Sequence, residues 1–568
     1  MKKLSTLILV LAILTAAAGF RIWGLDWGLP TKQHFFSYHP DETILLNAAI
    51  SVDLLSGHLD PGFYNYGSLY VFLSNLAITT ATLLGAINIG GDPLSSIGEF
   101  AKVYMSGRVV TVTLGILTVY LMYALGRRMH GRLVGLLAAA FMAIAPIHVM
   151  HSRFMTVDVP ATFFVALSLL YAARIPDDDR WRNYILAGLH AGFAAATKYN
   201  AGLVVIALGA AHLASINGRP LLLAFHRKWL GGIAAAAAGF LIGCPGSVLN
   251  TQAFVRDFRF EALHAGSGHG LLFAGTGSGF SYHLMHSLLP GLGPALLIPG
   301  IPGVVLALTK ARPFSVVARI LTPWRLQIAM PQAAVRDLML IAFLASYYTL
   351  IGIAQVRFAR YTMPILPIVL LLGARIVVEC ARTRRITAAI VSTVTAACLL
   401  YTAAYTAALS TVFASADTRD EAAVWVRTNV PEGSSIALPT TPWFYTPPLL
   451  PSFGQVNAED RLAAAEDSAE YVFVVDGREE WNARLFAETA PDYAILSEFE
   501  YEDRRRVGDM DYKRYFEILK QDYELEKRFS RRPAILGMPF PLQWEMPHDM
   551  SYASPEILIY RRSGQSSG

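Results

Sequence analysis

The chain has 568 residues, of which 54% are hydrophobic and 16% charged, and its mean hydropathy is +0.41. An average soluble domain is about 25% charged, so this composition is typical of a membrane protein. The net charge of +5 is small and the basic residues recur in short segments between apolar runs, which argues against nucleic acid as a partner. Cys244, Cys380 and Cys398 all lie in apolar runs and indicate neither a disulfide framework nor a thiolate metal site.

Apolar runs long enough to cross a bilayer, roughly 20 residues each, recur over residues 1–410. The first run, 4–20, follows Lys2-Lys3; small residues near its end would suit signal cleavage, but its length favours an uncleaved span. Together the runs predict about 11 transmembrane helices, the other ten at 103–126, 133–150, 158–174, 183–197, 201–216, 229–249, 282–309, 337–354, 361–380 and 386–410.

The distribution of Lys and Arg predicts which loops face the cytoplasm. If Lys2-Lys3 is cytoplasmic, the basic segments 127–132, 174–182, 219–228, 310–336 and 382–385 are cytoplasmic too, as the positive-inside rule requires. Counting the apolar run 69–89 as another span would reverse every later loop, so we expect juxtamembrane helices in the first external loop. One external face then carries residues 21–102, 151–157, 198–200, 250–281, 355–360 and everything after 411.

The composition changes near Ser415, and residues 411–568 are predicted to form a small soluble α/β domain on the external side of a transmembrane catalytic domain, 1–410. A helix is expected to open at Asp417, and the short apolar runs 471–475 and 557–560 are expected to be strands. The charged stretch 501–532 is expected to be helical.

Two acidic positions stand at membrane entrances of the external face. His39-Pro40-Asp41-Glu42 opens an amphipathic run after the first span, and Asp158 begins a later span. Each could be a helix N-cap, because a carboxylate there accepts free backbone N–H groups and favours the helix dipole. Their common side favours a chemical role, since charge at a membrane entrance is costly. Glu42 and Asp158 could also hold a divalent cation.

Basic residues on the same face point to an anionic ligand. Lys198 interrupts an otherwise apolar hairpin, either as a snorkelling side chain or as a cation for an anionic headgroup. Arg357 and Arg360, directly before Tyr361, stand where the positive-inside rule disfavours arginine, and a guanidinium fork suits phosphate.

The glycine-rich loop at 261–282 contains His264 and His269. The spacing of the histidines matches no strong zinc signature, and a mobile substrate loop is favoured over a metal site. The chain contains no Walker lysine loop, no dinucleotide-binding glycine fingerprint and no nucleophile elbow, which disfavours ATP-driven transport and serine hydrolysis.

In their order and sidedness, several motifs over residues 1–410 resemble the GT-C superfamily. Within it they are similar to the bacterial protein O-mannosyltransferase and lipid A aminoarabinose transferase group. The motifs are His39-Pro40-Asp41-Glu42, Phe63-Tyr64-Asn65-Tyr66-Gly67, Arg127-Arg128, Ser152-Arg153 with Asp158-Val159-Pro160, Thr197-Lys198-Tyr199, and Arg360-Tyr361-Thr362-Met363-Pro364.

The resemblance implies a polyprenyl-phosphate-linked sugar donor, no nucleotide, and transfer on the external face. It assigns Asp41 as the first-loop catalytic aspartate, Asp158 as the second-loop acidic residue, and Arg360 and Tyr361 as donor-headgroup contacts. At Tyr66-Gly67-Ser68-Leu69 the chain departs from a lysine-containing segment of the aminoarabinose transferases, and Lys198 or the arginines could replace that lysine.

Together these observations predict a membrane glycosyltransferase of the inner or plasma membrane, with its active site and C-terminal domain on the periplasmic or extracellular side. An acceptor hydroxyl on a protein, lipid or glycan would attack the donor while Asp41 removes its proton, which typically contributes about 10²- to 10⁴-fold. Lys198, Arg357 and Arg360 would stabilise the departing phosphate, with Glu42 and Asp158 supporting. Further substrate contacts are expected from His39, Tyr66, Arg153, His264 and His269.

A secondary transporter or lipid flippase is the alternative from another class. Such a protein would place its charges near the midplane and show repeats, which are not visible in this sequence. A catalytically inactive binding or scaffold homologue is the third hypothesis.

Overall fold

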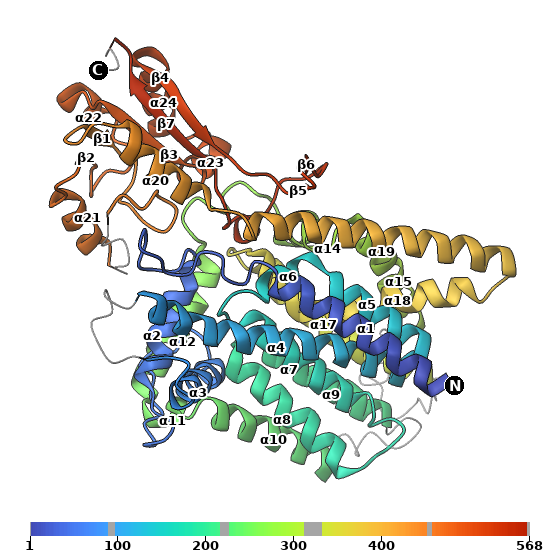
Figure 1. Ribbon diagram of the computed structural model, residues 1–568. Coiled ribbons are helices and arrows are strands. Elements are labelled where there is room, and N and C mark those ends of the chain that lie inside the picture. Colours follow the sequence, from blue (N-terminus) through green and yellow to red (C-terminus); the bar gives the residue numbers. More distant parts are fainter. Residues whose placement is uncertain (1, 89–96, 216–225, 312–331, 451–456, 565–568) are drawn as a thin grey trace.

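The computed structural model describes residues 2–88, 97–215, 226–311, 332–450 and 457–564. Helices fill most of the chain up to Phe413, and a smaller region with strands follows at one end of the helical bundle (Figure 1). The predicted fold class, a helical polytopic membrane protein with a small C-terminal α/β region, is confirmed.

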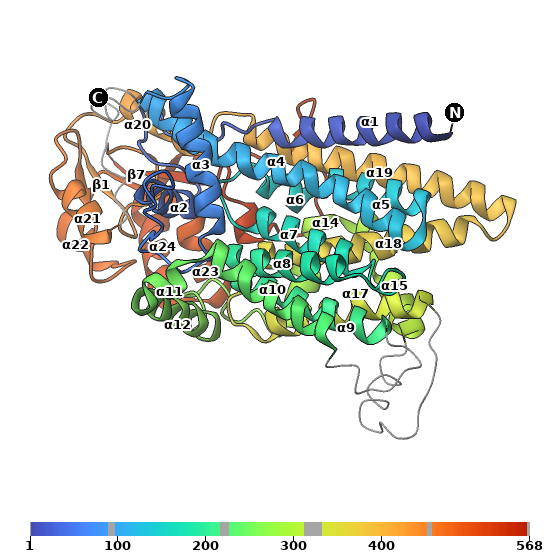
Figure 2. The ribbon, with the colours of Figure 1, turned by 90° about the horizontal axis from the view of Figure 1, so that it is seen from below.

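The long helices lie roughly along one direction, and the N-terminus is at the end opposite the strand-containing region in both views (Figures 1 and 2). The bundle is made of α1 (Lys2–Ile22), α4 (Ile97–His130), α5 (Arg132–Ile144), α6 (Pro146–His151), α7 (Asp158–Ala172), α8 (Trp181–Thr197), η1 (Tyr199–Val204), α9 (Val205–Ser215), α10 (Arg227–Gly243), α15 (Pro294–Ala311), α17 (Gln332–Ile353), η4 (Ala359–Ile365), α18 (Leu366–Ala381) and α19 (Arg385–Phe413).

Among the described residues, six helices are long and apolar enough to cross a membrane, and four shorter helices are also apolar. The predicted number of about 11 spans therefore stays a prediction. The basic segments 219–228 and 310–336, used to predict sidedness, lie largely outside the described residues.

Three predicted spans are interrupted at Pro or Gly, because Pro lacks the N–H that an α-helix needs and clashes with the preceding turn. The span predicted at 133–150 divides into α5 and α6 at Pro146, and the one at 229–249 ends α10 before Pro245 and continues as α11 (Gly246–Leu249). The one at 282–309 is not a single helix. It consists of α13 (Gly279–Tyr282), a π-helical turn η3 (His283–Leu288), α14 (Leu289–Leu292) and α15, which starts after Gly293 at φ +70°.

Short helices gather at the end of the bundle that faces the strand-containing region: α2 (Pro40–Ser51), α3 (Leu69–Leu83), α11 and α12 (Thr251–Ser267) (Figures 1 and 2). Helix α3 is the apolar segment predicted to be juxtamembrane. Buried Tyr70 of α3 donates a hydrogen bond to the carbonyl of Gly107 in α4 at 2.9 Å. The segment predicted as a loop at 261–267 is the last part of α12.

The C-terminal region contains a five-stranded mixed sheet in the order β2-β1-β3-β7-β4, in which β1 pairs in parallel with β2 and β3, and β7 pairs antiparallel with β3 and β4. A separate hairpin pairs β5 with β6. The strands are β1 (Ser435–Ala437), β2 (Val472–Val474), β3 (Tyr493–Ser497), β4 (Tyr523–Phe529), β5 (Ala534–Ile535), β6 (Met538–Pro539) and β7 (Ile557–Arg562).

Helices cover both faces of this sheet, because alternate side chains of a strand point to opposite faces. Ile495 of β3 packs in one cluster with α20 (Thr418–Asn429), and Leu496 packs in another with α22 (Arg484–Thr489) and α24 (Met510–Asp522). The predicted strands at 471–475 and 557–560 are confirmed. The prediction of helix throughout 501–532 is wrong after Asp522, since α23 (Glu498–Val507) and α24 are followed by β4.

Candidate functional site

Two carboxylates and two cations predicted from the sequence meet where α2, α7, η4 and the end of α8 come together. The Lys198 ammonium donates to Asp158 Oδ1 at 2.5 Å, and the Arg360 guanidinium lies 3.1 Å from Asp41 Oδ2 and 3.8 Å from Asp158 Oδ2. The Asp158 side chain is 2% exposed and the Asp41 side chain 21% exposed. We call Asp41, Asp158, Lys198 and Arg360 the charged cluster.

Local structure places each member of the cluster at a helix end. His39 is the N-cap of α2, and its Nδ1 accepts from the Asp41 N–H at 3.3 Å, which holds Asp41 in the first turn. Asp158 begins α7, while Lys198 ends α8 in an extended conformation. Burial lowers the pKa of His39 well below its usual value, so the ring is neutral at pH 7 and free to accept.

The aromatic segment before α3 packs closely against the Lys198 turn. A Cβ on Gly67 would lie 2.0 Å from the carbonyl oxygen of Ala196, so the backbones can approach this closely only with glycine at position 67. The Tyr199 hydroxyl donates to the carbonyls of Tyr64 and Tyr66 at 2.7 and 3.1 Å. Burial and the charge of Asp41 raise the pKa of Tyr66 well above its usual value. Tyr66 is therefore a neutral phenol near the cluster.

Aromatic rings support both cations. Lys198 Nζ lies 4.4 Å from the ring centroid of Tyr361, and the Arg360 guanidinium lies 4.0 Å from that of Phe358. Such cation–π contacts contribute about 0.5–2 kcal/mol each. Tyr361 thus lies beside the cluster, and Phe358 is an addition that the sequence did not identify.

The segment between β6 and β7, called the C-terminal segment below, supplies two residues that the sequence analysis missed. Asp549, 1% exposed, accepts hydrogen bonds from the backbone N–H groups of Ala359 and Arg360 at 3.0 and 2.8 Å. The Tyr552 hydroxyl accepts from Arg360 Nη1 at 3.2 Å, and the Tyr552 ring meets His39 edge-on at 4.8 Å. No recognisable motif lies near these residues, and they are distant from the other cluster residues in the chain.

Burial opposes the charge of Arg360, but the anionic groups around it prevail. Carboxylate oxygens of Asp41, Asp549 and Asp158 lie 3.1, 3.7 and 3.8 Å from its nitrogen atoms. The guanidinium is thus a fixed positive charge at the centre of the cluster.

Glu42, predicted beside Asp41 as a catalytic carboxylate, lies outside the charged cluster. It is fully buried, and both its oxygens accept from Arg108, at 2.8 and 2.7 Å, while Oε1 also accepts from the Met155 N–H at 2.6 Å. Glu42 and Asp158 therefore have different partners within the protein. Among the described residues, no group of three or more His, Cys, Asp or Glu side chains is placed to hold a metal ion.

Arg153 and Arg357, also predicted at the site, make other contacts. Arg153 donates to the carbonyls of Phe20 and Trp23 at 2.7 and 2.8 Å, and so fastens the end of α1. Arg357 donates to the Thr276 hydroxyl and the Gly277 carbonyl at 2.7 and 2.8 Å, which holds the connection between α12 and α13.

The two predicted histidines lie together at the end of α12. Nε2 of His264 and Nδ1 of His269 are 3.0 Å apart, and the His269 ring lies 5.6 Å from that of Phe358, the ring beneath Arg360. This pair borders the cluster without contacting its carboxylates.

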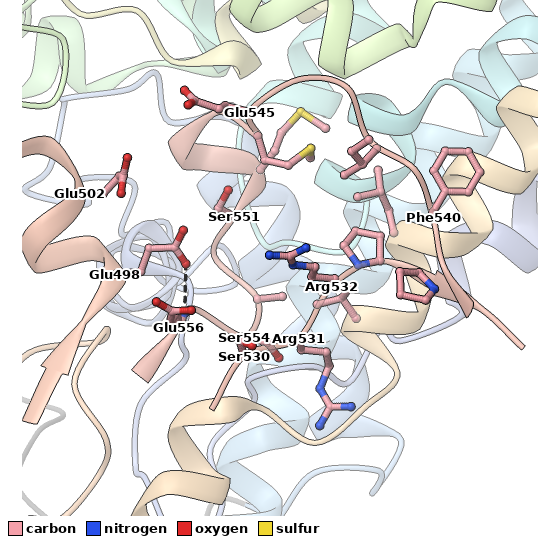
Figure 3. A pocket seen from close by; sticks show the side chains of 18 of the residues that line it. Glu498, Glu502, Ser530, Arg531, Arg532, Phe540, Glu545, Ser551, Ser554 and Glu556 are labelled. Atoms are coloured by element: carbon pink, nitrogen blue, oxygen red, sulfur yellow. Dashed lines mark hydrogen bonds between the residues drawn. The ribbon is translucent and has the colours of Figure 1, made fainter. Parts of the chain in front are cut away.

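Two cavities are lined in part by charged residues of α23. The larger, of about 830 Å³, is lined by Glu498 and Glu502 of α23, by Arg532 before β5, and by the C-terminal segment including Glu545 (Figure 3). The smaller, of about 380 Å³, shares Glu498, Glu502 and Glu545 and is also lined by His548. His548 lies next to Asp549 in the chain, and its ring is 6.1 Å from that of Phe358, so the smaller cavity shares a lining residue with the surroundings of the cluster.

An apolar groove of about 330 Å³ lies between α15, α17 and α18. Its lining includes Leu297 and Ile301 of α15, Leu344 of α17, and Ile365. Ile365 ends η4, the short helix that carries Arg360 and Tyr361, so one element joins the groove to the charged cluster.

Comparison with known families gives one match within the helical part of the chain. Residues 100–242, which include Arg153, Asp158 and Lys198, match the family described as dolichyl-phosphate-mannose-protein mannosyltransferase. The predicted resemblance to the GT-C superfamily is confirmed. The functional class that this match supports is a membrane glycosyltransferase of the GT-C type, and no curated protein sequence matches the chain significantly.

The chain also matches several solved structures at low sequence identity. An Archaeoglobus fulgidus oligosaccharyltransferase tethered to an acceptor peptide is 12% identical, with a TM-score of 0.47 over 97% of this chain and 77% of that one. ArnT from Cupriavidus metallidurans bound to undecaprenyl phosphate is 12% identical, with a TM-score of 0.44 over 97% of both chains. The S. cerevisiae Pmt1–Pmt2 complex bound to the sugar donor is 18% identical, with a TM-score of 0.33 over 44% and 34%.

Proposed function

We propose that the chain transfers a sugar from a polyprenyl-phosphate donor to an acceptor hydroxyl on the external face of the membrane, with Asp41 as the general base. The observation that carries the proposal is the charged cluster itself. Asp41 has the most exposed side chain of the carboxylates around Arg360, at 21% against 2% for Asp158 and 1% for Asp549. It is therefore the carboxylate that an acceptor can reach.

The reaction needs one base and a positively charged site for the leaving group. Asp41 takes the proton of the acceptor hydroxyl as its oxygen attacks the anomeric carbon, and the phosphate leaves with the electron pair of the glycosidic bond. Arg360 and Lys198 stabilise the negative charge that develops on the departing oxygen. No covalent enzyme intermediate is required, and the configuration at the anomeric carbon inverts.

The apolar groove suits the prenyl chain of the donor. It lies among helices of the bundle and is joined to Arg360 and Tyr361 through η4, so a chain lying in it would bring its phosphate to the cluster. The matching family is named for a dolichyl-phosphate sugar, which is a donor of this chemical class. The smaller cavity, lined by His548, gives a polar acceptor a separate approach.

A transporter or flippase without transferase activity remains the alternative function. The charged cluster contacts the C-terminal segment through Asp549 and Tyr552, at one end of the bundle. A transporter would instead place its ion and substrate sites near the middle of the membrane, so this position favours the transferase.

The test is transfer by purified protein from labelled polyprenyl-phosphate hexoses to candidate protein, lipid and glycan acceptors. Asp41→Asn should lower kcat by about 10²- to 10⁴-fold. Asp26→Asn is the matched control, because Asp26 belongs to the same external segment and is exposed. Full turnover by Asp41→Asn would refute the assigned base, and transfer that needs no lipid-linked donor would refute the proposed function.

A further inference from the structure

The segment containing Asp549 reaches the charged cluster from the far end of the chain. It forms the short 3-10 helix η5 (His548–Met550), between the β5–β6 hairpin and β7. The Asp549 carboxylate is 1% exposed and caps the start of η4 by accepting from two backbone N–H groups. The C-terminal region is therefore in direct contact with the backbone that carries Arg360.

The same carboxylate also faces the Arg360 side chain. Asp549 Oδ2 lies 3.7 Å from Arg360 Nη1 and 3.9 Å from His151 Nε2, and the latter ring is fully buried. The Tyr552 hydroxyl accepts from that Nη1 atom, while the other terminal nitrogen of the guanidinium lies 3.1 Å from Asp41. The guanidinium is thus held from one side by the C-terminal segment and faces Asp41 with the other.

A structural cap alone does not require this arrangement. A neutral Ser or Asn side chain caps a helix start through a single oxygen, whereas Asp549 uses one carboxylate oxygen for each of the two N–H groups. A buried carboxylate is costly unless it is paired with charge, and here the charge is that of Arg360. Asp549 therefore acts on both the backbone and the side chain of Arg360.

We infer that Asp549 is a positioning residue for the transfer reaction, which fixes the Arg360 guanidinium where it meets the donor phosphate. The C-terminal segment is then part of the active site and not only an appended domain. This inference rests on the proposed function, because it assigns Arg360 to the phosphate of the donor.

Asp417 provides the matched control for a purely structural role. It is also buried, at 4% exposed, and also lies in the C-terminal region. Its carboxylate accepts from Arg419, from the Trp27 indole at 3.0 Å and from the Ser554 N–H at 3.0 Å. These contacts dock the same region without touching the charged cluster.

The experiment measures binding of undecaprenyl phosphate, donor KM, acceptor KM and melting temperature for the full-length protein. Asp549→Asn should weaken undecaprenyl phosphate binding and raise the donor KM by roughly 10- to 100-fold, because small displacements of a phosphate-binding group are costly. The acceptor KM should stay within about twofold, since Arg360 holds the donor. Asp417→Asn should lower the melting temperature but leave lipid phosphate binding by the folded protein unchanged.

Tyr552→Phe provides a second variant if Asp549→Asn does not fold, because it removes only the hydroxyl next to Arg360 Nη1. It should raise the donor KM in the same direction by a smaller factor. Unchanged lipid phosphate binding in Asp549→Asn, or in Tyr552→Phe where Asp549→Asn does not fold, with only a lower melting temperature, would overturn the inference and leave the proposed function intact. Wild-type protein that neither binds undecaprenyl phosphate nor uses a lipid-linked donor would overturn both.

Discussion

Replacing Glu42 with glutamine should destabilise the fold and leave the chemistry of the folded protein unchanged. Glu42 and Arg108 are both fully buried and form a two-point ion pair at 2.8 and 2.7 Å. Arg108 also donates to the carbonyls of Leu25 and Trp27 at 2.6 and 2.7 Å, so the pair joins α2 and α4 to the turn that follows α1. Glutamine would leave a buried guanidinium without its counter-charge.

Breaking a buried ion pair by removing one partner typically costs about 3–5 kcal/mol, and we expect a loss of this size. The assay is unfolding of the purified protein by SDS in mixed micelles, followed by tryptophan fluorescence. In the double variant Glu42→Gln with Arg108→Met, stability should partly recover, because the uncompensated charge is gone.

Two results would refute this reasoning. A loss below about 1 kcal/mol would show that the pair is no stronger than an exposed one. A variant of normal stability that has lost transfer would instead support the catalytic role that the sequence predicted for Glu42. Transfer by the folded fraction, measured with a saturating donor, separates these outcomes.

Two further predictions concern the groove and the docking of the C-terminal region. Ile301→Trp, which fills the apolar groove, should raise the donor KM more for long prenyl chains than for short ones; equal changes for both would contradict the assignment of the groove. Burial raises the pKa of Asp420 from 3.8 to about 6, although it accepts from the Tyr38 hydroxyl. The folded form therefore binds a proton that the unfolded form lacks between these values, so stability should fall as pH rises through this window. Asp420→Asn should remove that fall in a melting-temperature series, and parallel curves for the two proteins would contradict it.

The positions of the cluster residues could be predicted from the sequence because of the cost of charge at a membrane boundary. Asp41, Asp158, Lys198 and Arg360 each interrupt or border an apolar run, and the basic loops indicate a common side for them. The structure brings these four residues together. Asp549 could not be found in this way, since it lies in a polar segment where a carboxylate carries no cost, and it meets Arg360 across 189 residues of chain.

The sequence grouped Asp41 with Glu42 because they are adjacent, but helix geometry separates them. Consecutive residues of an α-helix point about 100° apart, so two neighbours in the first turn of α2 face different surroundings. Asp41 faces Arg360 and Glu42 faces Arg108. Which of the two would point to the cluster depended on packing between distant helices, which a local motif does not specify.

In the proposed mechanism, the ion pair between Arg360 and Asp41 allows the donor to release the base as well as to supply the sugar. Arg360 has partners on two sides, and those from the C-terminal segment, Asp549 and Tyr552, are more deeply buried than Asp41. A donor phosphate that binds the guanidinium would therefore displace Asp41 more readily than Asp549. Once released, the Asp41 oxygens can accept the proton of the acceptor hydroxyl. Arrival of the donor thus makes the base available, so Asp41→Asn should bind undecaprenyl phosphate at least as tightly as the wild type while losing transfer. Weaker binding by this variant would show that Asp41 helps to hold the phosphate site and does not compete for it.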